Sequence, residues 1–223
     1  MLPSPPERFS MRAIGREILQ VVNLEKGLGY TLYALTRAPG STLRNYLFHD
    51  RSKLTKPVGF LVLIVALATY LTVTFFTFQE EFQIAGMTIH ATDSSPDTTH
   101  NILRFFKEYF NLLLLLVLPF YALGSYWLFR KNRWNFAEHL VINAYILGYQ
   151  NAIYLLFFPL LFLPGSHNIY LLATLIYHLY AYRLVFEAPG FRGLLRAFGA
   201  FLVSYLLYYL FIAIVFVGVA ILF

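Results

Sequence analysis

Long apolar runs alternate with short polar segments along most of this chain. At about 1.5 Å per helical residue, roughly 20 residues cross the hydrocarbon layer of a bilayer. Five runs approach or exceed that length: 57–78, 109–129, 137–163, 169–186 and 194–222. The pattern predicts an all-α polytopic membrane helix bundle with five transmembrane helices in a domain spanning 57–223.

The region before the first run, residues 1–56, is basic and amphipathic. Its apolar positions recur at helical spacing, at Met11, Ile14, Ile18, Val21 and Val22. This spacing predicts a helix that lies on an anionic membrane face or packs on the protein's own helices. A second short helix is expected over 30–36, and Ser41 is expected to cap a third that ends at Phe48.

Lys and Arg are distributed unevenly between the two sides of the predicted bundle. Residues 1–56 hold nine, 130–136 hold three and 183–196 hold three, whereas the long loop 79–108 holds two. Cationic loops stay in the cytoplasm, so the N-terminus is predicted inside and the C-terminus outside. Five cations form a basic collar before the first crossing, expected to contact anionic headgroups: Arg37, Arg44, Arg51, Lys53 and Lys56.

Composition agrees with a membrane protein and removes several chemistries. The sequence is 59% hydrophobic and 13% charged, and it contains no cysteine. Disulfides, thiolate zinc sites and cysteine nucleophiles are therefore excluded. The outer loop 79–108 contains a sequence that could form a small hairpin about Ala85 and Gly86. Its histidines and aspartates match no metal-ligand spacing, so we assign neither a metal nor a cofactor.

The third run carries unusual polarity for a membrane helix. At 100° per residue, His139, Asn143 and Gln150 fall within about 40° of one another, and Glu138 lies on a neighbouring stripe. Asn135 and Glu138 have the spacing of a capping box, which would satisfy the start of the helix. An ion pair between Glu138 and Arg183 is compatible with that interpretation, because both lie at the cytoplasmic depth.

The fourth run has a polar side of its own. Thr174, His178 and Tyr182 recur every fourth residue, with Arg183 beside them. Facing the third run, they would form a hydrogen-bonded seam that joins the two helices. The same side chains could instead line a pocket that binds an anionic headgroup or passes a proton. The candidate binding residues are Glu138, His139, Asn143, Gln150, His178, Tyr182 and Arg183.

Several sequence landmarks resemble a bacterial multi-pass family known only as the domain of unknown function numbered thirty-six sixty-seven. They are the turn at Arg37, Pro39 and Gly40, the stretches 44–46 and 51–57, and the pair Glu138 and His139, within residues 27–198. The resemblance implies a bacterial inner (plasma) membrane protein and supplies no activity. Similar proteins often begin with a four-cysteine zinc ribbon, which this sequence lacks.

These observations favour a non-enzymatic membrane protein that interacts with lipids or with another membrane component. Its expected partners are membrane lipids, with another membrane protein or a second copy of the chain as the alternative. Nucleic acid is not expected, because the basic residues follow the membrane boundary. A small-solute or lipid transporter with a path between the third and fourth crossings is the alternative. A third hypothesis makes Glu138 and His139 the acid and base of an intramembrane enzyme.

Overall fold

The computed structural model describes residues 27–75, 81–84, 87–90, 97–132, 134–163 and 166–222. The amphipathic helix predicted from the spacing of Met11 to Val22 lies outside these residues. The side chains of a few residues within these ranges, such as His167, are likewise not described.

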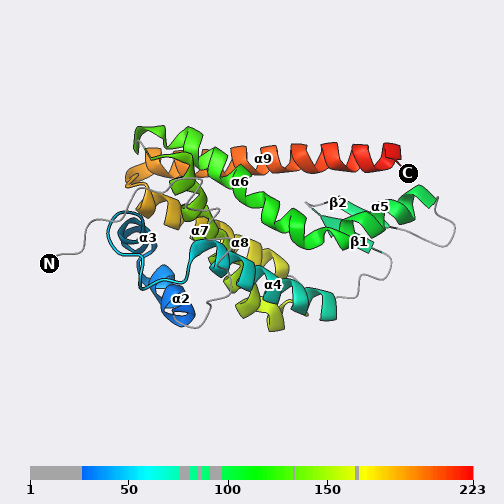
Figure 1. Cartoon of the computed structure of the whole chain (residues 1–223), viewed down its shortest axis with the longest axis horizontal. Helices are drawn as coiled ribbons and strands as arrows, with labels where there is room; N and C mark the ends of the chain where they lie inside the picture. Colours follow the sequence, from blue (N-terminus) through cyan, green and yellow to red (C-terminus); the bar gives the residue numbers. More distant parts are fainter. Residues whose placement is uncertain are drawn as a thin grey trace.

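Helices make up most of the described chain, with one small β-hairpin (Figure 1). The elements in chain order are α2 (Leu28–Arg37), α3 (Pro39–Phe48), α4 (Pro57–Phe75), β1 (Glu81–Ile84), β2 (Met87–His90), α5 (Asp97–Glu108), α6 (Phe110–Leu128), η1 (Arg130–Asn132), α7 (Phe136–Phe157), η2 (Phe158–Leu160), α8 (Ser166–Val185) and α9 (Gly190–Leu222).

Each of the five apolar runs contains a long helix, as the hydrophobic pattern predicts. The start of α3 differs from the expectation, because the helix begins at Pro39 and its N-cap is Ala38. Proline is favoured in a first helical turn, where its missing N–H is not needed. Ser41 therefore lies inside the helix, where its hydroxyl donates to the carbonyl of Ala38 at 3.3 Å.

The hairpin expected in the long loop is present as two antiparallel strands. Glu81 pairs with His90, and Ile84 pairs with Met87. The following helix, α5, packs on α9 and contacts both strands. The stacked rings of Phe106 and Phe216 form part of its contact with α9.

The helix α7 is at the centre of the bundle and packs against α4, α6 and α8. The helix α9 runs along α6, and α3 packs on α8. Figure 1 shows α2, α3 and the start of α9 at one end of the molecule, and the hairpin, α5 and the end of α9 at the other. We call the first of these the α3 end.

Small residues allow the closest helix contacts. A Cβ at Gly124 of α6 would lie 2.7 Å from the carbonyl oxygen of Ala200 and 2.1 Å from Ser204 Oγ, both on α9. A Cβ at Gly148 of α7 would lie 2.6 Å from the ring of Phe60 on α4. Such close approach increases van der Waals contact, which drives the association of helices in lipid.

Two helical stretches in the described residues are long and apolar enough to cross a membrane, Phe136–Leu160 and Gly190–Leu222. Two further helical stretches, Pro57–Thr72 and Leu112–Leu128, are apolar but shorter. The helix α8 belongs neither to the long apolar helices nor to these shorter ones. Length and apolar composition alone are weak evidence, because the core helix of a soluble protein can have both. The finding is compatible with a membrane protein.

Candidate functional site

Glu138 forms the capping box that the sequence predicts at the start of α7. The backbone N–H of Glu138 donates to Asn135 Oδ1 at 2.9 Å, and the N–H of Asn135 donates to Glu138 Oε2 at 2.6 Å. Two of the N–H groups that a helix start leaves unsatisfied thereby gain partners. The carboxylate also faces the positive end of the helix dipole.

A buried chain of hydrogen bonds joins α8, α7 and α6. The hydroxyl of Tyr182 donates to Asn143 Oδ1 at 2.6 Å, and Asn143 Nδ2 donates to Ser125 Oγ at 2.9 Å. Ser125 Oγ lies 2.9 Å from His139 Nδ1. All four side chains are almost completely buried. We call this chain of side chains the buried polar chain.

Gln150 and His178 behave differently from the rest of the predicted seam. Gln150 Nε2 donates to the backbone oxygen of Thr174 at 3.1 Å, a second link between α7 and α8. His178 is fully buried against the rings of Tyr121, Tyr182 and Phe201, and neither of its ring nitrogens has a hydrogen-bond partner among the described residues.

Arg44 of α3 binds the end of α8. Its Nη1 donates to the carbonyl oxygens of Leu184 and Val185, the second at 3.2 Å. Its Nε lies 3.4 Å from Glu187 Oε1. The last carbonyls of a helix have no partner within the helix, so a guanidinium at this position stabilises the end of α8.

The chain turns sharply after α8. The N–H of Ala188 donates to the carbonyl of Arg183 at 3.0 Å, the long bond of a Schellman motif. Glu187 occupies the left-handed position of this turn, with φ of 48°. Glycine is usual at such a position, so Glu187 costs about 1–2 kcal/mol in backbone strain. Asn132 Nδ2 donates to the carbonyl of Phe186 and holds the turn from the other side.

A pocket of about 500 Å³ lies beside this turn and is lined by Arg44, Tyr180, Arg183, Leu184 and residues 187–189. We call it the first pocket. Nε of Arg183 is buried and has no hydrogen-bond partner in the described part of the chain. A buried guanidinium nitrogen without an acceptor is unusual, because donors removed from water are normally paired. Arg44 and Arg183 thus place two positive charges at the first pocket.

Arg183 forms no ion pair with Glu138 in the described residues, so the pairing compatible with the capping box is not formed. The reason is local: Glu138 Oε2 accepts from the backbone of Asn135, and Arg183 lines a pocket formed with α3 instead. The predicted binding residues therefore do not form one site. His139, Asn143 and Tyr182 belong to the buried polar chain and Arg183 to the first pocket, while Glu138, Gln150 and His178 lie in neither.

A second pocket, of about 210 Å³, lies on the other side of the turn. Its lining includes Lys131, Arg192 and Arg196, together with the shared residues 187–189. These three cations are exposed at the surface. The two pockets together present five cationic side chains and one carboxylate, that of Glu187.

The predicted basic collar contains side chains in several different settings. Besides Arg44, Arg51 caps its own helix by donating to the carbonyls of Tyr46 and Leu47. Lys53 lies 3.9 Å from Asp50, while Arg37 and Lys56 are exposed. The collar therefore combines exposed cations with arginines that stabilise helix ends.

Sequence reasoning did not identify Ser125, Glu187, Lys131, Arg192 or Arg196 as site residues. A lone serine in an apolar run gives no signal. The arginines at 192 and 196 entered the reasoning only as indicators of orientation, although their spacing of four places them on one face of α9. That spacing next to a Pro-Gly turn was the available signal.

Comparison with known proteins finds a matching family, but it does not provide an activity. Residues 25–69 match the family described as "Protein of unknown function (DUF3667)". The match confirms the resemblance to this family over the segment that contains α2, α3 and most of α4. Searches of curated proteins and of solved structures each found no match.

Proposed function

We propose that this chain, which carries the DUF3667 segment, is a multi-pass membrane protein that binds anionic lipid headgroups at its α3 end. The five crossings would be α4, α6, α7, α8 and α9, with residues 1–56 in the cytoplasm and the C-terminus outside. The resemblance to a bacterial family suggests the inner membrane as the setting.

The distribution of side chains supports a lipid environment. Large apolar residues face outward on the long helices, among them Leu67, Leu156, Ile176, Leu210 and Ile214. The interior is mostly apolar, and it also contains the whole buried polar chain. A water-soluble protein would bury those apolar surfaces, because exposed apolar patches lower solubility. In a bilayer, the acyl chains of the lipids cover these outward-facing apolar side chains.

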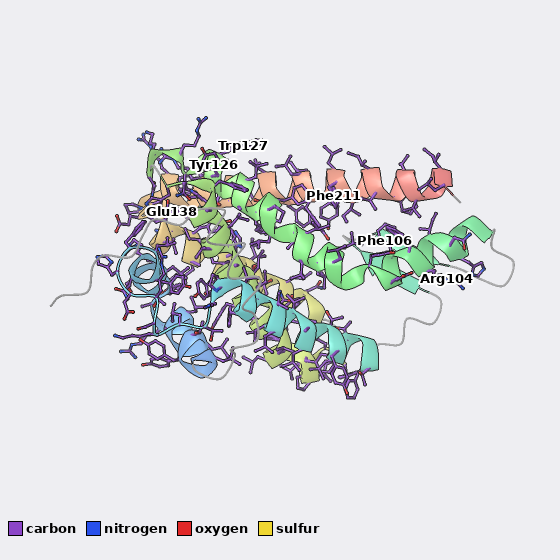
Figure 2. The ribbon with its side chains drawn as sticks, viewed as in Figure 1. Arg104, Phe106, Tyr126, Trp127, Glu138 and Phe211 are labelled. Atoms are coloured by element: carbon purple, nitrogen blue, oxygen red, sulfur yellow. The ribbon has the colours of Figure 1, made fainter. Side chains whose placement is uncertain are left out.

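The positions of the cations support the proposed orientation. Arg44, Lys131, Arg183 and Arg192 surround the turn between α8 and α9, at the α3 end. Figure 2 shows Glu138 near that end and Arg104 near the opposite one. Cationic ends remain in the cytoplasm during insertion, so the α3 end is assigned to the cytoplasm.

One observation supports lipid binding most directly: two arginines, Arg44 and Arg183, line the first pocket, and Nε of Arg183 has no hydrogen-bond partner in the described part of the chain. Next to it lie exposed apolar side chains, those of Leu184 and Tyr180. A ligand that satisfies both has a phosphate and an apolar part. The inner leaflet of a membrane supplies such molecules at the same depth, and each nearby cation adds about 1 kcal/mol of attraction.

Lipid binding can be tested with a matched pair of variants. We would measure binding of phosphatidylglycerol and phosphatidylcholine to the full chain in detergent by native mass spectrometry. Arg183→Gln should lower phosphatidylglycerol affinity roughly fivefold, whereas Arg104→Gln, at the opposite end, should leave it unchanged. Equal affinity of wild type and Arg183→Gln for phosphatidylglycerol would refute this function.

The orientation needs a separate measurement. Single cysteines placed at exposed Lys131 and exposed Arg104 should react with a membrane-impermeant maleimide from opposite sides of the membrane. The chain has no native cysteine, so no background reaction is expected. Labelling of both positions from one side would show that the assignment of crossings is wrong.

The buried polar chain favours a structural role over a transport path. Asn143 and Tyr182 are fully buried and bonded directly to each other across α7 and α8. Such bonds join membrane helices, each contributing about 0.6 kcal/mol. A transporter would need these groups to part and expose their polar atoms, so lipid binding at the α3 end is the function we put forward.

A further inference from the structure

The turn between α8 and α9 has cationic pockets on both of its sides. The first pocket lies against α3 and contains Arg44 and Arg183. The second lies against η1 and contains Lys131, Arg192 and Arg196. Residues 187–189 line both pockets, so the two spaces are neighbours separated only by this turn.

Resting on the lipid binding proposed above, we infer that the site takes a lipid with two phosphates, one in each pocket, joined by a short bridge across the 187–189 turn. Diphosphatidylglycerol has this chemistry. Its two phosphates are linked through a glycerol, and its acyl chains make it strongly apolar.

The position of Glu187 favours two separate phosphates over a joined diphosphate. Glu187 lines both pockets, and its carboxylate lies 3.4 Å from Nε of Arg44. A pyrophosphate group centred over the turn would place its charge next to this carboxylate, and like charges repel. Two phosphates held apart can each face cations while the uncharged glycerol bridge passes Glu187.

The charge balance also fits a doubly charged ligand. One monovalent phosphate would leave most of the five cations around the turn without an anionic partner, since Glu187 is the one carboxylate in the two linings. Arg44 is held by the carbonyls of Leu184 and Val185, and Arg192 and Arg196 extend from consecutive turns of α9. Cations therefore lie on both sides of the turn, where each group can face one phosphate.

Exposed apolar side chains beside the turn would accept the acyl chains. Leu184 lies at the first pocket, and Phe191 and Leu195 extend from the first turns of α9. Phe191 is 71% exposed, and with Leu184 and Leu195 it gives the surface beside the turn an apolar character. A soluble bisphosphate would leave these surfaces in water, so the ligand is a lipid.

The experiment compares diphosphatidylglycerol with phosphatidylglycerol on the full chain, by native mass spectrometry and by lipid-induced shifts in melting temperature. Wild type should bind diphosphatidylglycerol at least roughly tenfold more tightly than phosphatidylglycerol. The double variant Arg192→Gln/Arg196→Gln should lose this preference, whereas Arg104→Gln should retain it. Circular dichroism checks that each variant remains folded.

The outcomes separate this inference from the function on which it rests. If both lipids bind but wild type shows no preference for two phosphates, the inference is wrong and lipid binding stands. If the double variant keeps the full preference, the second pocket is not involved and the inference is also wrong. If inorganic pyrophosphate displaces the lipid as effectively as added diphosphatidylglycerol does, a joined diphosphate is the ligand. Absence of binding by either lipid overturns both proposals.

Discussion

A single methyl group at Gly40 tests whether α3 is held against α8 as closely as the structure shows. A Cβ at this position would lie 2.6 Å from the carbonyl oxygen of Leu184 and 2.7 Å from its carbonyl carbon, both backbone atoms that cannot rotate away. Overpacking of this kind costs about 1–3 kcal/mol. Gly40→Ala should therefore lower the free energy of unfolding, even after the gain of up to about 1 kcal/mol in helix propensity.

Gly29 provides a matched control. It is the second residue of α2, as Gly40 is of α3, and a Cβ at Gly29 meets nothing within 4 Å. Gly29→Ala should raise the free energy of unfolding by about 0.5–1 kcal/mol through reduced chain entropy. The same substitution is thus expected to lower the free energy of unfolding in α3 and to raise it at the equivalent position of α2.

The assay is reversible unfolding in mixed micelles of dodecyl maltoside and sodium dodecyl sulfate, followed by circular dichroism. Lipid affinity is measured on the same samples, because Arg44 lies one turn after Gly40 and contacts the same helix end. Gly40→Ala should weaken phosphatidylglycerol binding, and Gly29→Ala should not. Equal or greater stability of Gly40→Ala relative to wild type would refute the close contact between α3 and α8.

Two further predictions concern single groups. Tyr182→Phe removes the hydroxyl that donates to Asn143, so it should lower the free energy of unfolding by about 0.6 kcal/mol and at most about 1.7 in the same assay; no change would mean that the bond contributes nothing. At the surface, hydrogen bonds from Ser52 hold the pKa of Asp50 below its ordinary value of 3.8. The resulting stabilisation is present above that value and is lost as the pH falls through the lower folded pKa. In a carboxyl NMR titration, Ser52→Ala should raise the pKa of Asp50, and an unchanged pKa would contradict this explanation.

The hydrophobic pattern was sufficient to predict where the helices lie, because the residues within each apolar run determine that the run is helical. The capping box at Asn135 and Glu138 was predictable for the same reason, since both partners lie within four residues. The hairpin about residues 85–86 also follows from a local pattern of strand residues flanking a turn. Local signals of this kind need no knowledge of which helices are neighbours.

The composition of the buried polar chain was only partly predictable. The angular positions of His139 and Asn143 placed them on one face of α7, and Tyr182 of α8 does meet Asn143. Ser125 of α6 was not predicted, although it lies between His139 and Asn143 in the network. Helical spacing identifies the polar face of one helix, but it does not say which neighbouring helix supplies the next donor.

The first pocket could not be predicted from the sequence, because residues from distant parts of the chain form it. Arg44 and Leu184 are 140 residues apart, and each belongs to a pattern that has a complete local explanation. An arginine before a membrane crossing is explained by anionic headgroups, and the end of a helix by the Pro-Gly turn that follows it. Nothing in either pattern requires the other, so their meeting became visible only in the fold.

The meeting of α3 with α8 gives a physical reason why the DUF3667 segment contains both a glycine and an arginine one helical turn apart. Gly40 lets the backbones approach, and Arg44 then reaches the carbonyls of Leu184 and Val185, which a helix end leaves unsatisfied. With those carbonyls occupied, the chain can leave α8 through a strained Glu187, and this turn separates the two cationic pockets. Of the five cations that line these pockets, the DUF3667 segment contributes one, Arg44.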